Sequence, residues 1–241
     1  MSLGTLHERE KLYAFAVDFL KSKRAEAVLD VACDYGLGTK ILSEGVTGVI
    51  TGLDIEGEAI TAANATYSAA NIKFLRGDAR HMEFPDGTFD AIVSFHTIEH
   101  ITPQEQAAFV RELARVMKPG APLLIATPDH EVWKLQGIAN MQDGHVGELT
   151  RHELEDVLTR NGFRVVQTYG QFMLKSTETF YARRLLNVLK KLDVLKLRRL
   201  LGKKVIDNVD IQTQPVSLND DVVSLGINDK ASVNVIVCGK A

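Results

Sequence analysis

Short apolar runs alternate with longer amphipathic stretches along the chain, a pattern typical of strands that alternate with helices. The apolar runs predict strands near residues 27–32, 48–54, 72–75, 90–95, 121–126, 163–170 and 232–238. Helical spacing predicts helices near residues 5–24, 37–44, 57–70 and 103–117. Because helical crossovers join parallel strands with right-handed connections, the pattern indicates an α/β fold with a doubly wound, mostly parallel seven-stranded sheet.

Capping residues mark the starts of two helices. Thr102 is expected to be an N-cap, and Glu105 three residues later completes a capping box. Thr150 and Glu153 repeat this spacing. The helix that follows Thr150 is expected to stop at residues 161–162, because a glycine directly after a helix is a common C-terminal signal.

The pattern divides the chain into a core, an insertion and a last strand. Residues 1–170 hold the N-terminal helix and the strand–helix units, residues 171–231 interrupt them, and residues 232–241 carry the last core strand. Within the insertion, residues 180–204 are helical in pattern, leucine-rich and basic, whereas residues 207–229 are polar and acidic. This insertion is interpreted as a lid, substrate platform or membrane-surface contact, or as an appendage that docks on the core or on a second subunit of a homodimer.

Composition narrows the classes of function. The chain has 241 residues, enough for one α/β domain with a sizeable core. Its formal net charge of −3 implies no general attraction to nucleic acid. No apolar run approaches the ~20 residues that span a bilayer and no signal peptide is recognisable, so a cytoplasmic location is expected. Two cysteines in a chain of this length give no disulfide framework.

The most informative segment is a strand, a glycine-bearing turn and a helix over residues 28–43. Glycine has no Cβ, so such a turn lets a ligand approach the backbone, and the helix N-terminus behind it offers N–H groups to an anion. Asp54 ends the next strand, about 20 residues past the turn, where a carboxylate accepts hydrogen bonds from a ribose diol. The segment therefore predicts an adenosine-type cofactor, and the missing G-x-G-x-x-G pattern argues against a dinucleotide.

The turn, Asp30-x-Ala32-x-Asp34-x-Gly36-x-Gly38, resembles the first motif of class I S-adenosylmethionine-dependent methyltransferases of the type 11/23-like kind. The resemblance runs in register over residues 5–170 and includes Gly52–Ile55, Arg76–Ala79, Phe89–Phe95, Glu112–Gly120, Ile125–Pro128 and Leu149–Leu154. It implies S-adenosyl-L-methionine as cofactor and a Rossmann-like sheet whose last strand inserts antiparallel beside the strand before it. It also implies an N-terminal helix that either covers the cofactor or only packs on the sheet.

The resemblance further implies a set of cofactor-binding residues. They are Asp30, Ala32, Cys33, Asp34, Tyr35, Gly36, Gly38, Asp54, Ile55, Gly77, Asp78, Ala79, Ser94 and Phe95. Asp54 is expected to hold the ribose diol, and Asp78 is expected to accept from the adenine amino group. Cys33 is interpreted as a small apolar residue rather than a reactive thiol.

Asp34 departs from the family pattern, which has glycine at this position near the methionine end of the cofactor. Aspartate enters the left-handed conformation more readily than most residues, so the turn is expected to survive. Its carboxylate could pair with the cofactor ammonium or repel the cofactor carboxylate. The second outcome leaves open a catalytically degenerate, methyltransferase-like binding protein.

Methyl transfer to a hydroxyl needs a base that removes the proton or a metal that lowers the hydroxyl pKa. His96, Glu99 and His100 follow the fourth predicted strand at i, i+3 and i+4, so a helical turn would place them on one face, and His145 is a further candidate. The pattern resembles metal-assisted O-methyltransferases of vicinal hydroxyls, with His96 in place of a glutamate. Three interpretations of these four residues follow. They have a structural role, or one of His96, His100 and His145 acts as a catalytic base, or all four bind a divalent metal.

The expected reaction is O-methylation of a hydroxyl on a small molecule or a saccharide intermediate, the saccharide being implied by resemblance alone. A quinone or other aromatic precursor is the alternative acceptor, and the degenerate binding protein is the alternative of another class. Trp133 and His130 follow the fifth predicted strand, where members of the family contact substrate.

Overall fold

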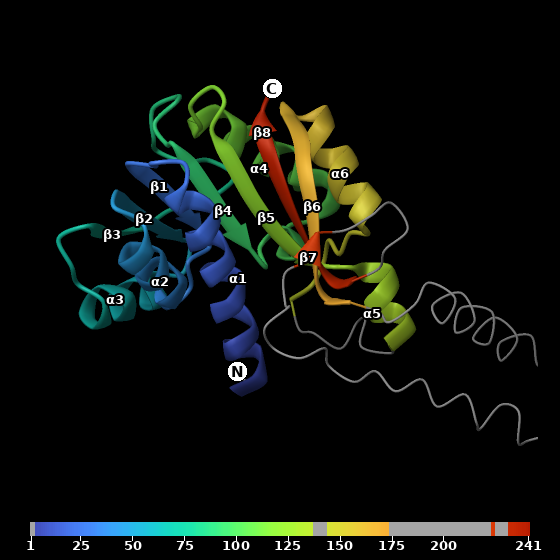
Figure 1. The fold of residues 1–241 in the computed structure, drawn as a ribbon, viewed down its shortest axis with the longest axis horizontal. Coiled ribbons are helices and arrows are strands. Elements are labelled where there is room, and N and C mark those ends of the chain that lie inside the picture. The colour runs from blue at the N-terminus through green and yellow to red at the C-terminus, as the bar shows by residue number, and fades with distance from the viewer. Residues whose placement is uncertain (1–2, 137–143, 174–222, 225–230) are drawn as a thin grey trace, which may run out of the picture.

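The computed structural model describes residues 3–136, 144–173, 223–224 and 231–241. Within these residues, one eight-stranded sheet has the order β3-β2-β1-β4-β5-β8-β6-β7 (Figure 1). The strands are β1 (Ala27–Val31), β2 (Val49–Asp54), β3 (Ile72–Arg76), β4 (Ala91–Phe95), β5 (Pro122–Pro128), β6 (Phe163–Met173), β7 (Val223–Ser224) and β8 (Ala231–Lys240). Every run that the sequence predicted as a strand is a strand, with ends that shift by a few residues.

The sheet is parallel from β3 to β5 and antiparallel around β8. β8 pairs antiparallel with both β5 and β6, which confirms the inserted last strand. The additional strand β7 lies in the segment that was predicted as an insertion, where Val223 and Ser224 pair with Gly170 and Tyr169. Two residues are too few to produce a readable period in the sequence. Most of the predicted insertion, including residues 180–204, lies outside the described residues.

The helices follow the predicted alternation with one addition. They are α1 (Leu3–Lys21), α2 (Leu37–Gly45), α3 (Gly57–Thr66), α4 (Pro103–Val116), α5 (His130–Gln136) and α6 (Arg151–Arg160), with a 3₁₀ turn, η1, at Ile98–His100. α5 lies where no helix was predicted, and α3 is shorter than the predicted helix 57–70. α3 ends earlier because Tyr67 leaves the helical conformation and residues 67–71 connect to β3. Among the described helices, none has the length and hydropathy to cross a bilayer.

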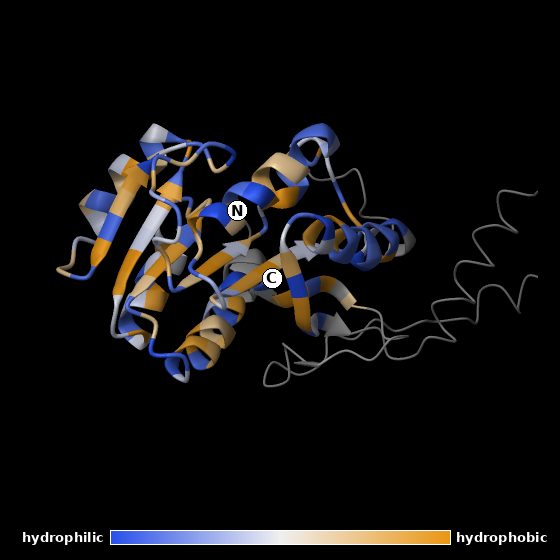
Figure 2. Ribbon diagram, turned by 90° about the horizontal axis from the view of Figure 1, so that it is seen from above, coloured by the Kyte–Doolittle hydropathy of each residue, from blue (hydrophilic) through white to orange (hydrophobic). Residues whose placement is uncertain are grey.

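Alternating side chains of the strands supply two apolar layers. Val28 and Val93 pack with α1 and α2 on one face of the sheet. Leu29 and Ile92 pack with α4 and α6 on the other face. Successive strand residues point to opposite faces, so a buried parallel strand reads as a continuous apolar run. The strands accordingly carry much of the hydrophobic colour in Figure 2, whereas the helices combine hydrophobic and hydrophilic residues.

One of the two predicted capping boxes is present. At the start of α6, the Thr150 hydroxyl accepts from the Glu153 backbone N–H, and the Glu153 carboxylate accepts from the Thr150 N–H. At the start of α4, the Thr102 hydroxyl instead donates to the Glu105 carboxylate at 2.7 Å and caps no backbone N–H. The Glu105 carboxylate also accepts a hydrogen bond from Arg80, and this contact holds the carboxylate away from the position that a capping box requires. The prediction for Thr102 is therefore wrong in its hydrogen bonds, although α4 begins directly after it.

Candidate active site

The sheet reverses its winding between β1 and β4. β2 and β3 follow β1 on one side, whereas β4 lies on the other side of β1 and is followed by β5. The carboxyl ends of strands at such a reversal form the crevice where open α/β sheets bind ligands. Ala32 and His96, the residues directly after these two ends, therefore mark the candidate active site.

The backbone at this edge is in the left-handed region at three non-glycine residues. φ is 58° at Ala32, 53° at Asp34 and 56° at His96, and among the described residues Arg24 alone shares this feature outside glycine. Such conformations cost free energy and cluster at sites where function requires them. The expected left-handed conformation of Asp34 is confirmed.

Asp30 is fully buried at the end of β1 and joins three elements. Its carboxylate accepts from the Tyr13 hydroxyl of α1 at 2.9 Å and from the Thr39 hydroxyl of α2 at 2.6 Å. Burial raises the pKa of Asp30 to about 6, although both hydrogen bonds favour the ionised form. The predicted contact of this side chain with the cofactor stays a prediction, and the structure gives it a second role in holding α1 and α2 around the turn.

The glycines of the turn allow close packing of helices. Gly36 has a φ of 85°, and a Cβ there would lie 2.7 Å from the Phe74 ring. A Cβ at Gly38 would lie 1.9 Å from Cζ of Tyr13, so glycine at this position admits α1 against the start of α2. α1 therefore packs over the turn as well as on the sheet, and its contact with a cofactor stays a prediction.

Asp54 ends β2 and connects it to the turn after β1. One carboxylate oxygen accepts from the Asp34 backbone N–H at 2.8 Å, and the other accepts from the Glu56 N–H at 2.9 Å. An ionised carboxylate has about four lone-pair sites, so both oxygens keep capacity for a diol. Ile55, beside it, is half exposed. The ribose contact of Asp54 stays a prediction.

A pocket of about 100 Å³ lies between α1 and the turn. Its lining residues come from α1, the turn and the start of α2, and they are Arg9, Glu10, Tyr13, Ala32, Cys33, Asp34, Tyr35, Leu37, Gly38 and Ile41. Arg9 Nη1 lies 3.0 Å from Asp34 Oδ2. Burial raises the pKa of the Cys33 thiol, so the thiol stays protonated, as its apolar interpretation requires. Tyr35 is largely exposed.

Sequence reasoning missed Arg9. The signal that could have found it is its spacing: it lies one helical turn before Tyr13, on the α1 face that meets the cofactor turn.

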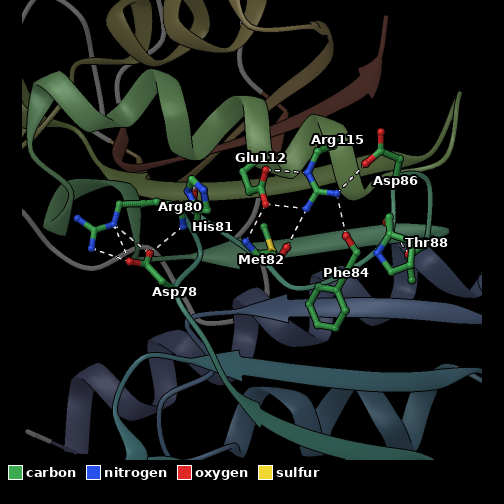
Figure 3. A network of polar contacts seen from close by, with 10 residues as sticks. Asp78, Arg80, His81, Met82, Phe84, Asp86, Thr88, Glu112 and Arg115 are labelled. Carbon is green, nitrogen blue, oxygen red and sulfur yellow. Dashed lines mark hydrogen bonds and ion pairs between the residues drawn. The ribbon is translucent and has the colours of Figure 1, made fainter.

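Gly77, Asp78 and Ala79 follow β3, where the adenine end was expected. The Asp78 carboxylate accepts from Arg80 Nε at 2.9 Å and from Arg80 Nη2 at 2.7 Å, and these bonds lower the pKa of Asp78 (Figure 3). The carboxylate is therefore ionised and paired. Ala79 packs against the core beneath α4 and α6. The contact of Asp78 with an adenine amino group stays a prediction.

A polar network fixes the chain after Asp78 on α4. The Met82 N–H donates to Glu112 Oε1 at 2.7 Å, while Arg115 donates to the Phe84 carbonyl at 2.7 Å and to the Met82 carbonyl at 2.8 Å (Figure 3). Glu112 and Arg115 also pair with each other at 2.7 Å. The network holds this connection through its backbone at Met82 and Phe84, and the Asp86 side chain of the same connection also accepts from Arg115 at 2.7 Å.

Ser94 and Phe95, at the end of β4, are residues that are 0% and 2% exposed. The Phe95 ring meets the Tyr13 ring edge-on, with centroids 5.2 Å apart. Both residues thus belong to the core, and the predicted cofactor contact at these two positions stays a prediction.

A histidine and glutamate cluster lies after β4 and β5. Glu99, in η1, is fully buried and accepts from the Thr127 hydroxyl at 2.9 Å. His96 Nδ1 lies 3.3 Å from the other Glu99 oxygen. Burial alone would raise the pKa of Glu99, but His96 and Thr127 outweigh it and the pKa is lowered. The predicted helical turn is present only as the 3₁₀ turn η1, which holds Glu99 and His100 but not His96. The Glu99 carboxylate lies between His96 and Thr127.

The segment around His145 completes the cluster. Potential ligand atoms of Glu99, His100 and His145 all lie within 4.8 Å of one another. The His100 and His145 rings meet edge-on at 4.7 Å, and the Trp133 ring stacks on His145 at 5.8 Å. The loop reaches Glu99 because the Val146 and Gly147 N–H groups donate to the Glu99 carbonyl. The structure thus brings together three of the four residues proposed for a metal, and His96 contacts the cluster through Glu99.

Hydrogen bonds orient both imidazoles of this cluster. His100 Nδ1 lies 3.0 Å from the Gly144 carbonyl, and His145 Nδ1 lies 3.1 Å from Glu148 Oε1. Because Nδ1–H donates to these oxygens, Nε2 carries the lone pair, and it can accept a proton or bind a cation. Glu148 also accepts from His130 Nδ1 at 2.5 Å. Sequence reasoning missed Glu148, for which no motif or spacing signal exists.

Comparisons with known proteins agree with this geometry. Residues 28–120 match the family described as a methyltransferase domain. A protein of Mycolicibacterium smegmatis named as a probable S-adenosylmethionine-dependent methyltransferase is 32% identical over 145 residues, which cover 60% of this chain and 54% of the relative. A fatty-acid O-methyltransferase of the same organism is 30% identical over 136 residues, covering 53% of this chain and 49% of the relative.

The fold itself also has solved counterparts. The PH0226 protein from Pyrococcus horikoshii OT3 superposes with a TM-score of 0.63 at 19% identity, over 100% of this chain and 92% of that protein. The chain spans about half the length of the curated relatives it matches. The sheet order and the turn after β1 agree with the matched methyltransferase domain, and together with the similar S-adenosylmethionine-dependent methyltransferases they support the class I family of these enzymes for this chain.

Proposed function

We propose that the protein transfers a methyl group from S-adenosylmethionine to a hydroxyl oxygen of a small-molecule or saccharide acceptor. The observation that carries the proposal is the pair of oriented imidazoles, His100 and His145, beside the buried Glu99. The cluster follows the carboxyl ends of β4 and β5, across the winding reversal from the turn after β1. One side of the crevice thus suits a nucleoside cofactor, and the other suits proton removal.

The residues of the turn fit the cofactor that the family uses. Asp54 offers carboxylate oxygens for a diol, and the pocket between α1 and the turn carries both a guanidinium and carboxylates for an amino-acid end. When bound, the cofactor supplies an electrophilic methyl group on a sulfonium whose departure leaves a neutral thioether. The turn and α1 then have to hold the cofactor so that its methyl faces the acceptor, because orientation accounts for much of the rate of such a transfer.

The histidine cluster fits the removal of the acceptor proton. As the acceptor oxygen takes the methyl group, its proton passes to an imidazole Nε2, which a hydrogen-bonded Nδ1–H orients. Glu148 stabilises the positive charge that then develops on His145, since its carboxylate lies at Nδ1. An imidazole titrates near neutral pH, which suits both uptake and release of this proton.

A divalent cation is the second version of the same chemistry. Glu99, His100 and His145 offer one oxygen and two nitrogen atoms within 4.8 Å of one another. Such a set suits zinc or a related transition metal, and each Nδ1 already has the carbonyl or carboxylate partner that metal-bound histidines have. In this version the three residues would hold the cation, which would supply Lewis-acid activation of the acceptor hydroxyl.

The proposed activity is tested by following S-adenosylhomocysteine formation with a panel of acceptors. The panel contains saccharides, aliphatic hydroxyl compounds, phenolic quinone precursors and amines. Turnover with a hydroxyl acceptor, and an ether in the product by mass spectrometry, supports the proposal. Turnover confined to amines, or to ring carbons of the phenolic compounds, contradicts O-methylation while leaving the family assignment intact.

The metal version is separated from the base version by chelation. The protein is treated with EDTA, analysed for bound metal and assayed before and after addition of zinc, iron, nickel or magnesium. Activity that is lost with EDTA and restored by one cation supports the metal version. Full activity of a metal-free protein supports proton removal by a histidine alone.

A further inference from the structure

Arg9 is the one basic residue among the described residues that line the pocket between α1 and the turn, and Glu10 and Asp34 are the acidic ones. The Arg9 side chain is 26% exposed and that of Asp34 is 41% exposed. An ion pair with this exposure contributes little to folding stability. Stability therefore gives no sufficient reason for this pair at the edge of the candidate active site.

A buried anchor fixes the position of Arg9. Tyr13 lies four residues later on α1, and its hydroxyl donates to Asp30 at 2.9 Å in the buried end of β1. Residues at i and i+4 lie on the same face of a helix, so the anchor directs Arg9 toward the turn as well. The Tyr13 ring occupies the space that a side chain at Gly38 would need. This contact fixes the position of α1 relative to the turn that lines the pocket.

We propose that Arg9 binds the α-carboxylate at the amino-acid end of the cofactor and that Asp34 positions the Arg9 guanidinium for this contact. The inference rests on the proposed cofactor. A guanidinium has five N–H donors in a planar fork, and Asp34 lies at Nη1, so a second carboxylate can pair along another edge. Glu10, which lines the same pocket, is the acidic neighbour that suits the cofactor ammonium.

This assignment accounts for aspartate at a position where the family has glycine. Alone, the Asp34 carboxylate would repel the carboxylate of an amino acid. Because Asp34 Oδ2 lies 3.0 Å from Arg9 Nη1, the negative charge of Asp34 is neutralised. The ion pair also restrains the Arg9 side chain before the cofactor binds, so that this side chain loses less rotamer entropy on binding. The backbone of Asp34 is held separately by its N–H bond to Asp54, so the turn keeps its shape when the Asp34 side chain changes.

The test compares two ligands by isothermal titration calorimetry. S-Adenosylhomocysteine has the amino-acid end, whereas 5′-methylthioadenosine keeps the adenosine and the thioether without it. We expect Arg9→Gln to weaken S-adenosylhomocysteine binding at least tenfold, which corresponds to about 1.4 kcal/mol, and to leave 5′-methylthioadenosine binding within twofold. Arg24→Gln, an exposed arginine beyond α1, is the matched control and should change neither affinity.

The role of Asp34 is tested in the same titrations. We expect Asp34→Asn to weaken S-adenosylhomocysteine binding by about threefold or more, and to add no further loss to Arg9→Gln, because a positioning residue acts only through its partner. An Asp34→Asn protein with tighter binding would show that Asp34 competes with the cofactor for Arg9 and would overturn the positioning role.

Further outcomes separate the inference from the proposed function. Wild-type protein that binds both ligands, with Arg9→Gln unchanged toward S-adenosylhomocysteine, overturns the carboxylate contact and leaves the cofactor assignment standing. Equal losses for both ligands in Arg9→Gln overturn it as well, because the effect would then lie on the adenosine side or on the fold. Wild-type protein that binds neither ligand overturns the cofactor assignment and this inference together.

Discussion

The two sides of the crevice are built in different ways. On the cofactor side, residues 30–38 form one continuous segment from the end of β1 through the turn to the start of α2, and Asp54 reaches the backbone of the turn from the next strand. On the acceptor side, η1, the start of α5 and the segment 144–149 meet from three separate stretches of the chain. The first side depends on the backbone conformation of one segment, and the second depends on contacts between separate segments of the chain.

This difference has a chemical reason. A nucleoside cofactor presents hydroxyls and an amino-acid end that backbone N–H groups and a few carboxylates can hold, so a local motif is sufficient. Proton removal needs an imidazole with a defined tautomer, and this requires a partner on each ring. In this protein Gly144 and Glu148 supply those partners to His100 and His145. Substitutions on the two sides should therefore separate turnover from cofactor binding.

The largest effect is expected on the acceptor side. His100→Ala or His145→Ala should lower turnover by about 10²–10⁴-fold, the usual contribution of acid–base catalysis, and leave S-adenosylhomocysteine affinity unchanged. The rate of S-adenosylhomocysteine formation and calorimetry measure the two quantities. His152→Ala, on the exposed side of α6, is the matched control and should be active. Wild-type rates in the variants of His96, His100 and His145 would remove these histidines from the mechanism.

The next effect is expected on the cofactor side. Asp54→Ala removes charge-assisted hydrogen bonds to the turn and to the proposed diol, each contributing about 1.5–3 kcal/mol. Affinity for S-adenosylhomocysteine and for 5′-methylthioadenosine should fall together, by about 100-fold or more. This equal loss distinguishes Asp54 from Arg9. Glu44→Ala on the surface of α2 serves as the control, and unchanged affinity in Asp54→Ala would exclude the assignment.

A pH-dependent effect on stability should follow from Asp30. Its pKa is raised by burial from 3.8 to about 6 in the folded protein, so folding favours the protonated form. The stabilising contribution is complete below pH ~4 and is lost as pH rises through about 6, by up to about 3 kcal/mol at 1.36 kcal/mol per pKa unit.

Urea unfolding of wild type and Asp30→Asn between pH 4 and 7 measures this contribution. The difference in unfolding free energy between the two proteins should shift in favour of the variant as pH rises. A difference that stays constant over this range would show that Asp30 does not titrate there.

The smallest effect is expected from a substitution in the polar network beside the crevice. Arg115→Met removes hydrogen bonds to the Phe84 and Met82 carbonyls and should lower the unfolding free energy by about 1–2 kcal/mol. Cofactor affinity should change by only a few-fold, because the network supports the chain after Asp78 without forming the turn. Arg111→Met, on the same helix, is the control. A large loss of affinity in Arg115→Met would place this network within the cofactor side.

The sequence by itself determined the strands, the turn after β1 and the capping box at Thr150. Each depends on residues a few positions apart, whose period and conformational preference are readable in one dimension. The spacing of His96, Glu99 and His100 likewise predicted a helical turn after β4; η1 holds Glu99 and His100, whereas His96 lies outside it with a positive φ.

Tertiary structure alone decided the partners of these residues. Arg9 meets Asp34 across 25 positions, and Gly144 meets His100 across 44, because whole elements pack against one another. The same packing diverts Glu105 from its expected cap to Arg80 and adds the two residues of β7 to the sheet. Such contacts follow from the positions of helices and strands in space, and no local preference of the chain specifies those positions.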